Sequence, residues 1–281
     1  MGILIHRRVG GQVAEELSAT SATPVLEDLA QEIRERERVE QELQVARRIQ
    51  QASLPKDVPK QEGWQITPYY QPAREVGGDF YDFLKLPKGR LGLVVGDATG
   101  KGVPAALVMA STRSMLRAVA QASNSPGEVL RSVNDPLVTD IPPNMFVTCF
   151  YAILDTKSGS LTYANAGHDL PYVRRVGGGC EELRARGMPL GLFPGMSYEE
   201  KEIAFEAGEA AIFYSDGLVE AHDSKGEMFG FPRLRALVAE HGKHGSLGDY
   251  LMEELYSFVG EGWEQEDDIT LLTLRRSPSL S

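Results

Sequence analysis

The sequence predicts an α+β fold in which helices cover antiparallel β-sheets. After residue 63 the chain consists mainly of short apolar runs of strand length, separated by turn-forming residues. One stretch, AILDTKSGSLTYA, has a turn of Thr-Lys-Ser-Gly between two such runs, which is typical of an antiparallel hairpin. The runs do not alternate regularly with helices, as serial βαβ units would. These observations favour antiparallel sheets over a parallel one.

Composition limits the classes of function. The 281 residues suffice for one large domain with an appendage or for two modest domains, and the formal net charge is −11. The acidic surplus argues against a general binder of nucleic acid or anionic membranes, because both are polyanions. Cys149 and Cys180 form no CxxC pair, so we expect no thiolate zinc site, no disulfide and a cytoplasmic location. No secretion signal or membrane span is predicted.

The first 56 residues are predicted to form an arm ahead of the main domain. Residues 1–23 are expected to be a flexible N-terminus, since residues 10–23 are small and polar. Residues 24–56 are charged and glycine-free, with small or apolar side chains at steps near three and four, which predicts one long helix. This helix would either lie against the following domain or form a parallel coiled coil in a homodimer. Its stripe consists of Leu26, Leu29, Ile33, Val39, Leu43 and Ala46.

Beyond a loop at residues 57–63, the remaining elements can be placed in order. Strands are expected at 64–70, 79–86, 90–96, 145–155, 160–166, 210–216 and 268–274. Helices are expected at 103–121, at 126–138, and at 231–259 with a break at 241–245.

The glycine-rich stretch GDATGKG at residues 96–102 could hold either a phosphate or a metal. A Walker-type loop needs four residues between its first Gly and the Gly-Lys-Ser/Thr, and here Gly96 and Gly100 enclose three. Gly102 stands where the magnesium-binding hydroxyl should be, and Asp97 would repel a phosphate. The dinucleotide pattern GxGxxG is also missing. The pattern therefore favours a metal, with Lys101 incidental to phosphate binding.

Carboxylates recur at the ends of the predicted strands. Asp97 and Asp216 end strands, whereas Asp79 and the pair Asp267-Asp268 open them. Taken singly, each could be a turn residue, a helix cap or a solvated side chain. Together in one domain they would repel one another unless cations lay between them. An all-oxygen ligand set of this kind suits Mg²⁺ or Mn²⁺.

Six motifs occur in a fixed order along the chain: EVGGDFYD (75–82), GDATGKGVPAALVMA (96–110), NAGHDLP (165–171), PLGL (189–192), YSDGLVEA (214–221) and DDITLL (267–272). The set resembles the metal-dependent serine/threonine protein phosphatases (PPM), specifically the bacterial SpoIIE/RsbU branch. The preceding RRIQQASLP also resembles the entry segment of that branch. The resemblance implies a sandwich of two antiparallel sheets flanked by helices, with residues 57–277 as the phosphatase domain and two Mn²⁺ or Mg²⁺ ions.

Carried over position by position, the resemblance assigns a role to each candidate site residue. Asp97 matches the carboxylate that bridges both metals, and the backbone carbonyl of Ala98 matches a ligand of the second ion. Asp216 and Asp267 match the carboxylates of the first ion, with Asp268 as the alternative to Asp267. Asp79 matches a carboxylate near the metal waters, either as a metal ligand itself or next to the ligands. Arg74 has the spacing of an arginine that grips the substrate phosphate, although a surface role fits it equally well.

One departure from the resemblance concerns proton transfer. Eukaryotic relatives have a histidine, a proton donor, in the metal loop where this chain has Thr99. His168 is a candidate replacement, but a histidine after a strand is more often a hydrogen-bonded structural residue. The hypothesis is phosphomonoester hydrolysis by a water that bridges two metals, with catalysis by Asp97, Asp216 and Asp267.

The resemblance also implies a substrate, namely a phosphorylated anti-anti-sigma protein with a STAS domain, acting in a partner-switching pathway. No residue of this chain specifies that partner. Two other classes stay open: a catalytically weak or inactive binding module on the same fold, and a two-metal hydrolase of nucleotide phosphates.

Overall fold

The computed structural model describes residues 3–242 and 245–278, with side chains from residue 27 onward. The chain divides into two compact units, Met1–Ala46 and Arg47–Ser281. None of the helices in the described ranges is both long and apolar enough to cross a membrane. Cys149 and Cys180 are both free thiols.

The N-terminal helix is longer than the sequence predicted. Helix α1 runs without interruption from Ile3 to Ser53, so the expected flexible segment over residues 1–23 is helical from residue 3, and residues 1–2 lie outside the described part. The predicted boundary at Pro24 relied on the small and polar character of residues 10–23, but the QVAEEL segment within them is rich in good helix formers. The helix ends at Ser53, since Pro55 disfavours helical geometry in the residue before it.

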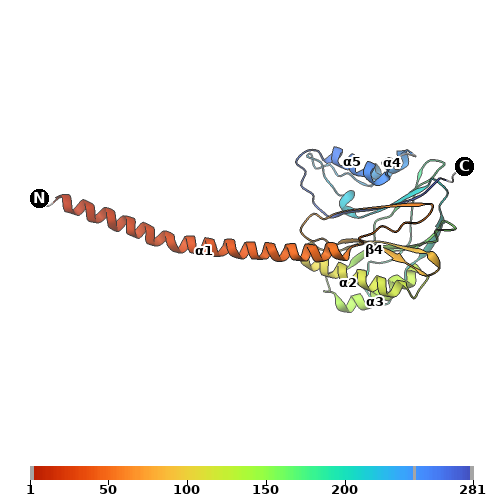
Figure 1. The fold of residues 1–281 in the computed structure, drawn as a ribbon, viewed down its shortest axis with the longest axis horizontal. Coiled ribbons are helices and arrows are strands. Elements are labelled where there is room, and N and C mark those ends of the chain that lie inside the picture. Colours follow the sequence, from red (N-terminus) through yellow and green to blue (C-terminus); the bar gives the residue numbers. More distant parts are fainter. Residues whose placement is uncertain (1–2, 243–244, 279–281) are drawn as a thin grey trace. The chain divides into compact units, whose positions relative to one another are not determined.

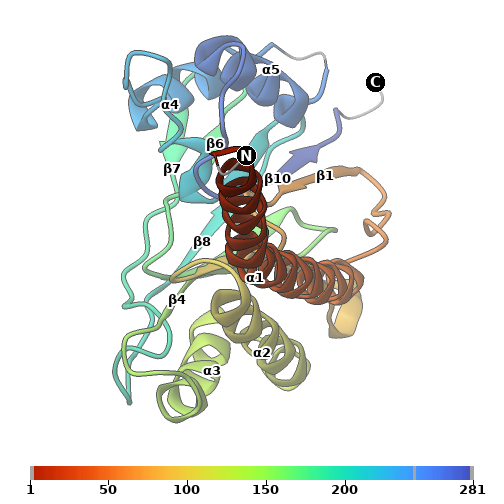
Figure 2. The same cartoon turned by 90° about the vertical axis from the view of Figure 1, so that its left-hand side faces the viewer.

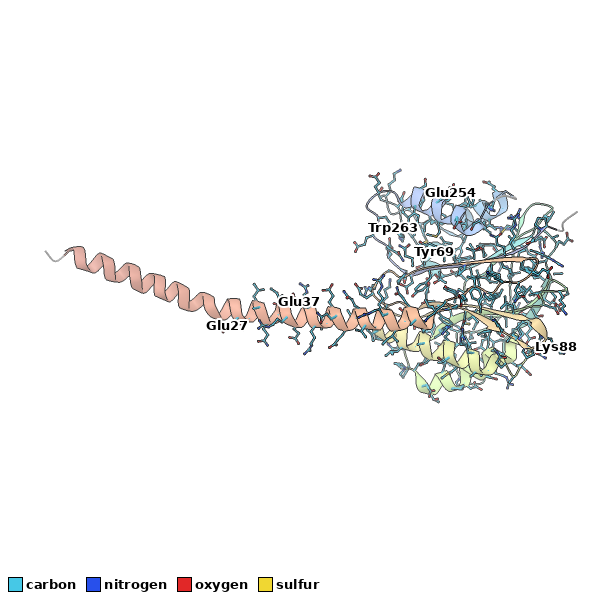
Figure 3. The ribbon with its side chains drawn as sticks, viewed as in Figure 1. Glu27, Glu37, Tyr69, Lys88, Glu254 and Trp263 are labelled. Carbon is cyan, nitrogen blue, oxygen red and sulfur yellow. The ribbon has the colours of Figure 1, made fainter. Side chains whose placement is uncertain are left out.

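The predicted stripe of α1 is largely open to solvent. Leu29, Ile33 and Val39 are between 46% and 50% exposed, and the side chain of Leu26 lies outside the described residues. Figure 3 shows the charged side chains that extend from the same helix, with Glu27 and Glu37 labelled. Both interpretations of the stripe therefore stay predictions.

The second unit contains two antiparallel five-stranded sheets. Sheet A has the order β1-β10-β9-β6-β7 and sheet B the order β2-β3-β4-β5-β8. The strands of sheet A are β1 (Trp64–Gln71), β10 (Ile269–Arg276), β9 (Ala210–Tyr214), β6 (Tyr172–Arg174) and β7 (Cys180–Glu182). Those of sheet B are β2 (Asp79–Lys85), β3 (Leu91–Ala98), β4 (Val147–Leu154), β5 (Ser160–Ala166) and β8 (Glu200–Ala204).

Helices cover the outer face of each sheet, so the unit has four layers (Figure 1). Helices α2 (Val103–Ala120) and α3 (Pro126–Asp140) pack on sheet B, and α4 (Phe231–Glu240) and α5 (Leu247–Val259) pack on sheet A. Short 3-10 helices occupy Pro87–Gly89 and Asp216–Leu218. The view in Figure 2 shows the two helical pairs on opposite sides of the sheets.

Each interface between layers has its own apolar core. The core between the two sheets includes Leu93, Phe150 and Phe213, all at most 1% exposed. The α2/α3 face is filled around Met109 and Leu116, and the α4/α5 face around residues that include Tyr214. Figure 3 labels Tyr69 and Trp263 near α5, where the Tyr69 hydroxyl lies 2.9 Å from that of Tyr256. This layering confirms the predicted fold class.

The seven predicted strands and the helices predicted after residue 63 all form, with ends within two residues of expectation. The predicted Thr-Lys-Ser-Gly turn joins β4 to β5. Strands β6, β7 and β8 were not predicted. β6 and β7 have only three residues each, and β8 is a largely exposed edge strand with the polar sequence EKEIA. Strands β7 and β8 lack the apolar pattern that two-sided burial produces, and β6 is buried but too short to show one.

Candidate active site

Carboxylates from both sheets meet where four strands begin or end. Asp79 opens β2 and faces Asp97, near the end of β3, in the register of sheet B. On sheet A, Asp216 follows β9, and Asp267-Asp268 precede the neighbouring β10. All five aspartates therefore lie at one edge of the sandwich, as their positions at strand ends suggested. They are close enough for their charges to act on one another.

Asp79 is the most buried carboxylate of this cluster, and it faces Asp97 in the register of sheet B. Asp79 is 1% exposed, and burial followed by the charges of Asp97 and Asp268 raises its pKa well above the usual range. Burial, then repulsion from Asp216, Asp267 and Asp268, raises the pKa of Asp97 to about 7. A hydroxyl from the other sheet also joins the pair, since Thr270 Oγ1 donates to Asp79 Oδ2 at 2.6 Å.

Asp216 and Asp267 are more accessible to solvent than the buried Asp79 and Asp268. Burial, then Asp267 and Glu220, raise the pKa of Asp216 to about 6. The side chain of Asp267 is 37% exposed, and its Oδ2 lies 2.9 Å from Nζ of Lys101. The charges in this cluster therefore oppose one another, which is the situation that a bound cation would relieve.

Asp268 differs from its neighbour Asp267 in how its oxygens are used. Its Oδ1 accepts a hydrogen bond from the backbone N–H of Ala73 at 2.8 Å, and its Oδ2 accepts one from Gly78 at 2.8 Å. At 6% exposure, the residue ties the start of β10 to the loop before β2. From the sequence, either Asp267 or Asp268 could be the direct metal ligand. In the structure both oxygens of Asp268 accept backbone hydrogen bonds, whereas Asp267 pairs with Lys101.

Ala98 and Thr99 have their backbones fixed against neighbouring loops. A Cβ atom placed on Gly78 would lie 2.4 Å from the Ala98 carbonyl oxygen, so only glycine permits this close approach. The Thr99 hydroxyl donates to the Phe146 carbonyl at 3.1 Å and accepts from the Phe146 N–H at 2.9 Å. Thr99 thus anchors the loop to the start of β4, and its hydroxyl proton is donated to the Phe146 carbonyl.

The two remaining sequence candidates differ in environment. Arg74 is exposed, and among the described residues it makes no hydrogen bond or ion pair. His168 is 6% exposed, its Nδ1 lies 2.8 Å from Thr148 Oγ1, and burial lowers its pKa to about 4. Its backbone is clamped at both N–H and C=O by the Asn165 side chain. These contacts agree with the structural role predicted for His168.

Two residues near the cluster were missed by sequence reasoning. Asp169 follows β5, and its pKa is raised to about 7 by burial and then by Asp216 and Glu220. The strand-end rule that found the other carboxylates would have found it too. Lys101 was set aside as incidental, yet its ammonium contacts both Asp267 and the Glu266 carbonyl. No signal in the sequence indicates that contact.

The donor set fits hard divalent cations. All candidate ligands are carboxylate or carbonyl oxygens, which Mg²⁺ and Mn²⁺ prefer. Within residues 27–242 and 245–278, no three acidic, His or Cys side chains are already gathered into a metal cage. Several of the oxygens are instead held by Lys101, Thr270 and backbone N–H groups. Side-chain movement at Asp267 would therefore have to accompany metal binding.

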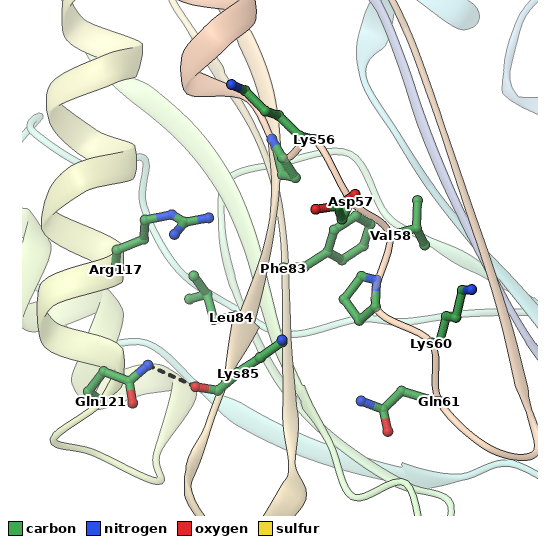
Figure 4. Close-up of a pocket in the computed structure, with 12 residues that line it drawn as sticks. Lys56, Asp57, Val58, Lys60, Gln61, Phe83, Leu84, Lys85, Arg117 and Gln121 are labelled. Atoms are coloured by element: carbon green, nitrogen blue, oxygen red, sulfur yellow. Dashed lines mark hydrogen bonds between the residues drawn. The ribbon is translucent and has the colours of Figure 1, made fainter.

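A separate cavity of about 990 Å³ lies away from the carboxylates (Figure 4). The loop after α1, the far end of β2 and the last turn of α2 line it. Within it, Gln121 donates a hydrogen bond to the backbone carbonyl of Lys85. None of the candidate site residues contributes to its wall.

Comparison with known proteins agrees with this architecture. Residues 87–277 match the family described as Stage II sporulation protein E (SpoIIE). Protein IcfG of Synechocystis is 32% identical over 84% of this chain and 42% of its own length. Phosphoserine phosphatase RsbU of Bacillus subtilis is 29% identical over 85% of this chain and 71% of its own length. The chain thus spans less than half of IcfG.

The fold also matches a solved phosphatase domain. The SiaA-PP2C domain of Pseudomonas aeruginosa superposes with a TM-score of 0.73 over 85% of this chain and 97% of that one, at 24% identity. At this level of identity the structural likeness supports the fold alone. That the chain belongs to a family rests on the family match. With its two-sheet PP2C-type sandwich and its match over most of the second unit, the chain belongs to the SpoIIE family.

Proposed function

We propose that this chain is a divalent-metal-dependent protein phosphatase acting on phosphoserine or phosphothreonine. The observation that carries the proposal is the meeting of aspartates from both sheets at one edge of a SpoIIE-family fold, with pKa values raised by burial and mutual repulsion. Similarity to RsbU, a protein named as a phosphoserine phosphatase, supports the substrate class.

Asp97, Asp216, Asp267 and the Ala98 carbonyl would hold two Mn²⁺ or Mg²⁺ ions. Bound ions would supply Lewis acidity to activate water and offset charge on the phosphoryl oxygens. Asp79, which accepts from Thr270 and faces Asp97 in the register of sheet B, would lie beside the ions as a further carboxylate, either as a ligand or next to the ligands. We assign Asp267 as the direct ligand over Asp268, because both oxygens of Asp268 accept backbone hydrogen bonds.

The chain's other groups would bind and orient the substrate. Arg74 is exposed at the loop that leads to Asp79, so its guanidinium is available for bidentate contact with a phosphate. Thr99 is held by Phe146 and would not protonate the leaving alkoxide. We therefore expect slow turnover of alkyl phosphoesters, for which leaving-group protonation matters most.

The proposed substrate is a phosphorylated STAS-domain anti-anti-sigma protein in a partner-switching pathway. Its support is the resemblance to the RsbU branch. A homodimer through α1 would bury the half-exposed side chains of Leu29, Ile33 and Val39. Residues 57–277 would form the phosphatase domain, and the acidic net charge gives no reason to expect a nucleic-acid partner.

The test is phosphate release from a phosphorylated STAS protein with and without Mn²⁺, with Asp97→Asn beside the wild type. We expect metal-dependent release that falls by at least about a hundredfold in the variant. An Asp140→Asn variant, at an exposed position outside the cluster, controls for loss of one charge. Release that persists in Asp97→Asn would refute the site. Activity on nucleotide phosphates alone, or on neither substrate, would favour the other two classes.

A further inference from the structure

Lys101 lies in a fixed turn between the candidate metal ligands and α2. Its neighbours Gly100 and Gly102 have φ angles of 92° and 76°, which L side chains rarely adopt. Thr99 holds the start of this turn to Phe146. The turn thus presents the Lys101 side chain to the loop before β10.

The ammonium group reaches across to the loop before β10. Nζ lies 2.9 Å from Asp267 Oδ2 and donates to the Glu266 carbonyl oxygen at 2.7 Å. Its charge also acts on Asp216, partly opposing the rise in the pKa of that carboxyl. Lys101 thus holds a positive charge among the carboxylates to which the first divalent ion is assigned.

In this arrangement Lys101 and a divalent cation would need the same carboxylate oxygen of Asp267. An oxygen in contact with an ammonium group can bind a cation only if the lysine leaves or shares it, and two positive charges a few ångströms apart repel. The side chains of Lys101 and Asp267 are 41% and 37% exposed, so water can replace either contact when the lysine moves. The pair is therefore exchangeable and not a buried structural ion pair.

We propose that Lys101 is an internal cation that competes with the first divalent metal for Asp267 and thereby sets the metal concentration at which the site fills. The inference rests on the proposed function, since it takes Asp267 as a metal ligand. Lys101 would act through Asp267 and not on the substrate. If Lys101 instead positioned Asp267 for the metal, replacing Lys101 with a neutral residue would weaken metal binding.

Isothermal titration calorimetry with Mn²⁺ at fixed pH and ionic strength distinguishes these roles. We expect Lys101→Met to bind Mn²⁺ about three- to tenfold more tightly than the wild type, a modest gain because the pair is solvent-screened. Lys101→Arg keeps the charge and should stay within about twofold of the wild type. Lys157→Met, at an exposed lysine in the β4–β5 turn, is the matched control and should change nothing.

Salt provides a second readout that a purely structural role would not change. The difference between Lys101→Met and the wild type should shrink as ionic strength rises, because screening weakens the repulsion. Lys101→Gln repeats the test if the methionine variant unfolds. Equal or weaker Mn²⁺ binding in both neutral variants would overturn the inference while leaving the metal site intact. Binding by none of the proteins would overturn the metal site itself, as would unchanged binding in Asp97→Asn.

Discussion

Replacing Asp97 with asparagine should stabilise the metal-free protein while it abolishes activity. The pKa of Asp97 rises from 3.8 to about 7, chiefly through burial and then through repulsion from three other aspartates. One pKa unit corresponds to about 1.4 kcal/mol, so ionised Asp97 opposes folding by at most about 4 kcal/mol. Because the cluster is coupled and partly solvated, we expect Asp97→Asn to recover about 2 kcal/mol at pH 8.

The pH dependence follows from the direction of the shift. A carboxyl whose pKa is raised in the folded state binds protons more tightly there than in the unfolded chain. Its contribution to stability is full below pH 3.8 and is lost as pH rises through about 7. The gain from Asp97→Asn should therefore be large at pH 8 and small at pH 5.

The assay is guanidinium unfolding followed by circular dichroism, in EDTA, at both pH values. Asp140→Asn again serves as the exposed control and should change stability little at either pH. Mn²⁺ should stabilise the wild type and reduce its loss of stability toward pH 8, because the ions offset the same repulsion. If Asp97→Asn were less stable than the wild type at pH 8 in EDTA, the picture of mutually repelling carboxylates would be wrong.

Two further predictions concern the supports of the site. Gly78→Ala places a Cβ 2.4 Å from the Ala98 carbonyl oxygen, so Mn²⁺ affinity measured by calorimetry should fall and unfolding should cost about 1–3 kcal/mol less. Asp82 is 1% exposed and pairs with Arg113 at 3.0 Å and Arg117 at 2.6 Å. Asp82→Asn would leave buried guanidinium charge unpaired, so the free energy of unfolding should drop by about 3 kcal/mol.

Each of these variants has a matched control. Gly177→Ala adds a methyl group where no atom lies within 4 Å, so both metal affinity and stability should be retained. Unchanged Mn²⁺ affinity in Gly78→Ala would argue against the Ala98 carbonyl as a ligand. Arg184→Met removes a guanidinium from a pair whose arginine side chain is 72% exposed, and should have a small effect. A similarly small effect of Asp82→Asn would show that the ion pairs of Asp82 with Arg113 and Arg117 do not stabilise the packing of α2.

Much of the fold could be predicted because burial on both faces leaves a clear pattern. Runs such as RLGLVVG and MFVTCFYAILD become interior strands of sheet B, and their apolar residues fill cores on either side. Short or edge strands bury little, so β7 and β8 leave no comparable pattern. For α1, the sequence contained conflicting local preferences, and the glycines and Pro24 did not stop the helix.

The location of the site could be predicted from the sequence, but the contacts that its residues make could not. Carboxylates at strand ends indicated which residues would come together, since neighbouring antiparallel strands bring opposite ends to one edge. What separates Asp267 from Asp268 is hydrogen bonding to Ala73 and Gly78, which lie about 190 residues earlier in the chain. The pairing of Lys101 with Asp267 is equally remote in sequence. Such contacts depend on the assembled fold.

The pairing of β1 with β10 has a consequence for how the protein is made. These strands join residues 64–71 to residues 269–276, and Asp216 and Asp267 lie beside the last of them. A ribosome must therefore deliver nearly the whole unit before the edge strand β1 gains its only partner in sheet A, or the carboxylates gain their partners. Until the last strand is synthesised, the earlier strands leave apolar faces exposed to solvent, and this favours misassembly. Production at low temperature or with chaperones should accordingly raise the yield of folded protein.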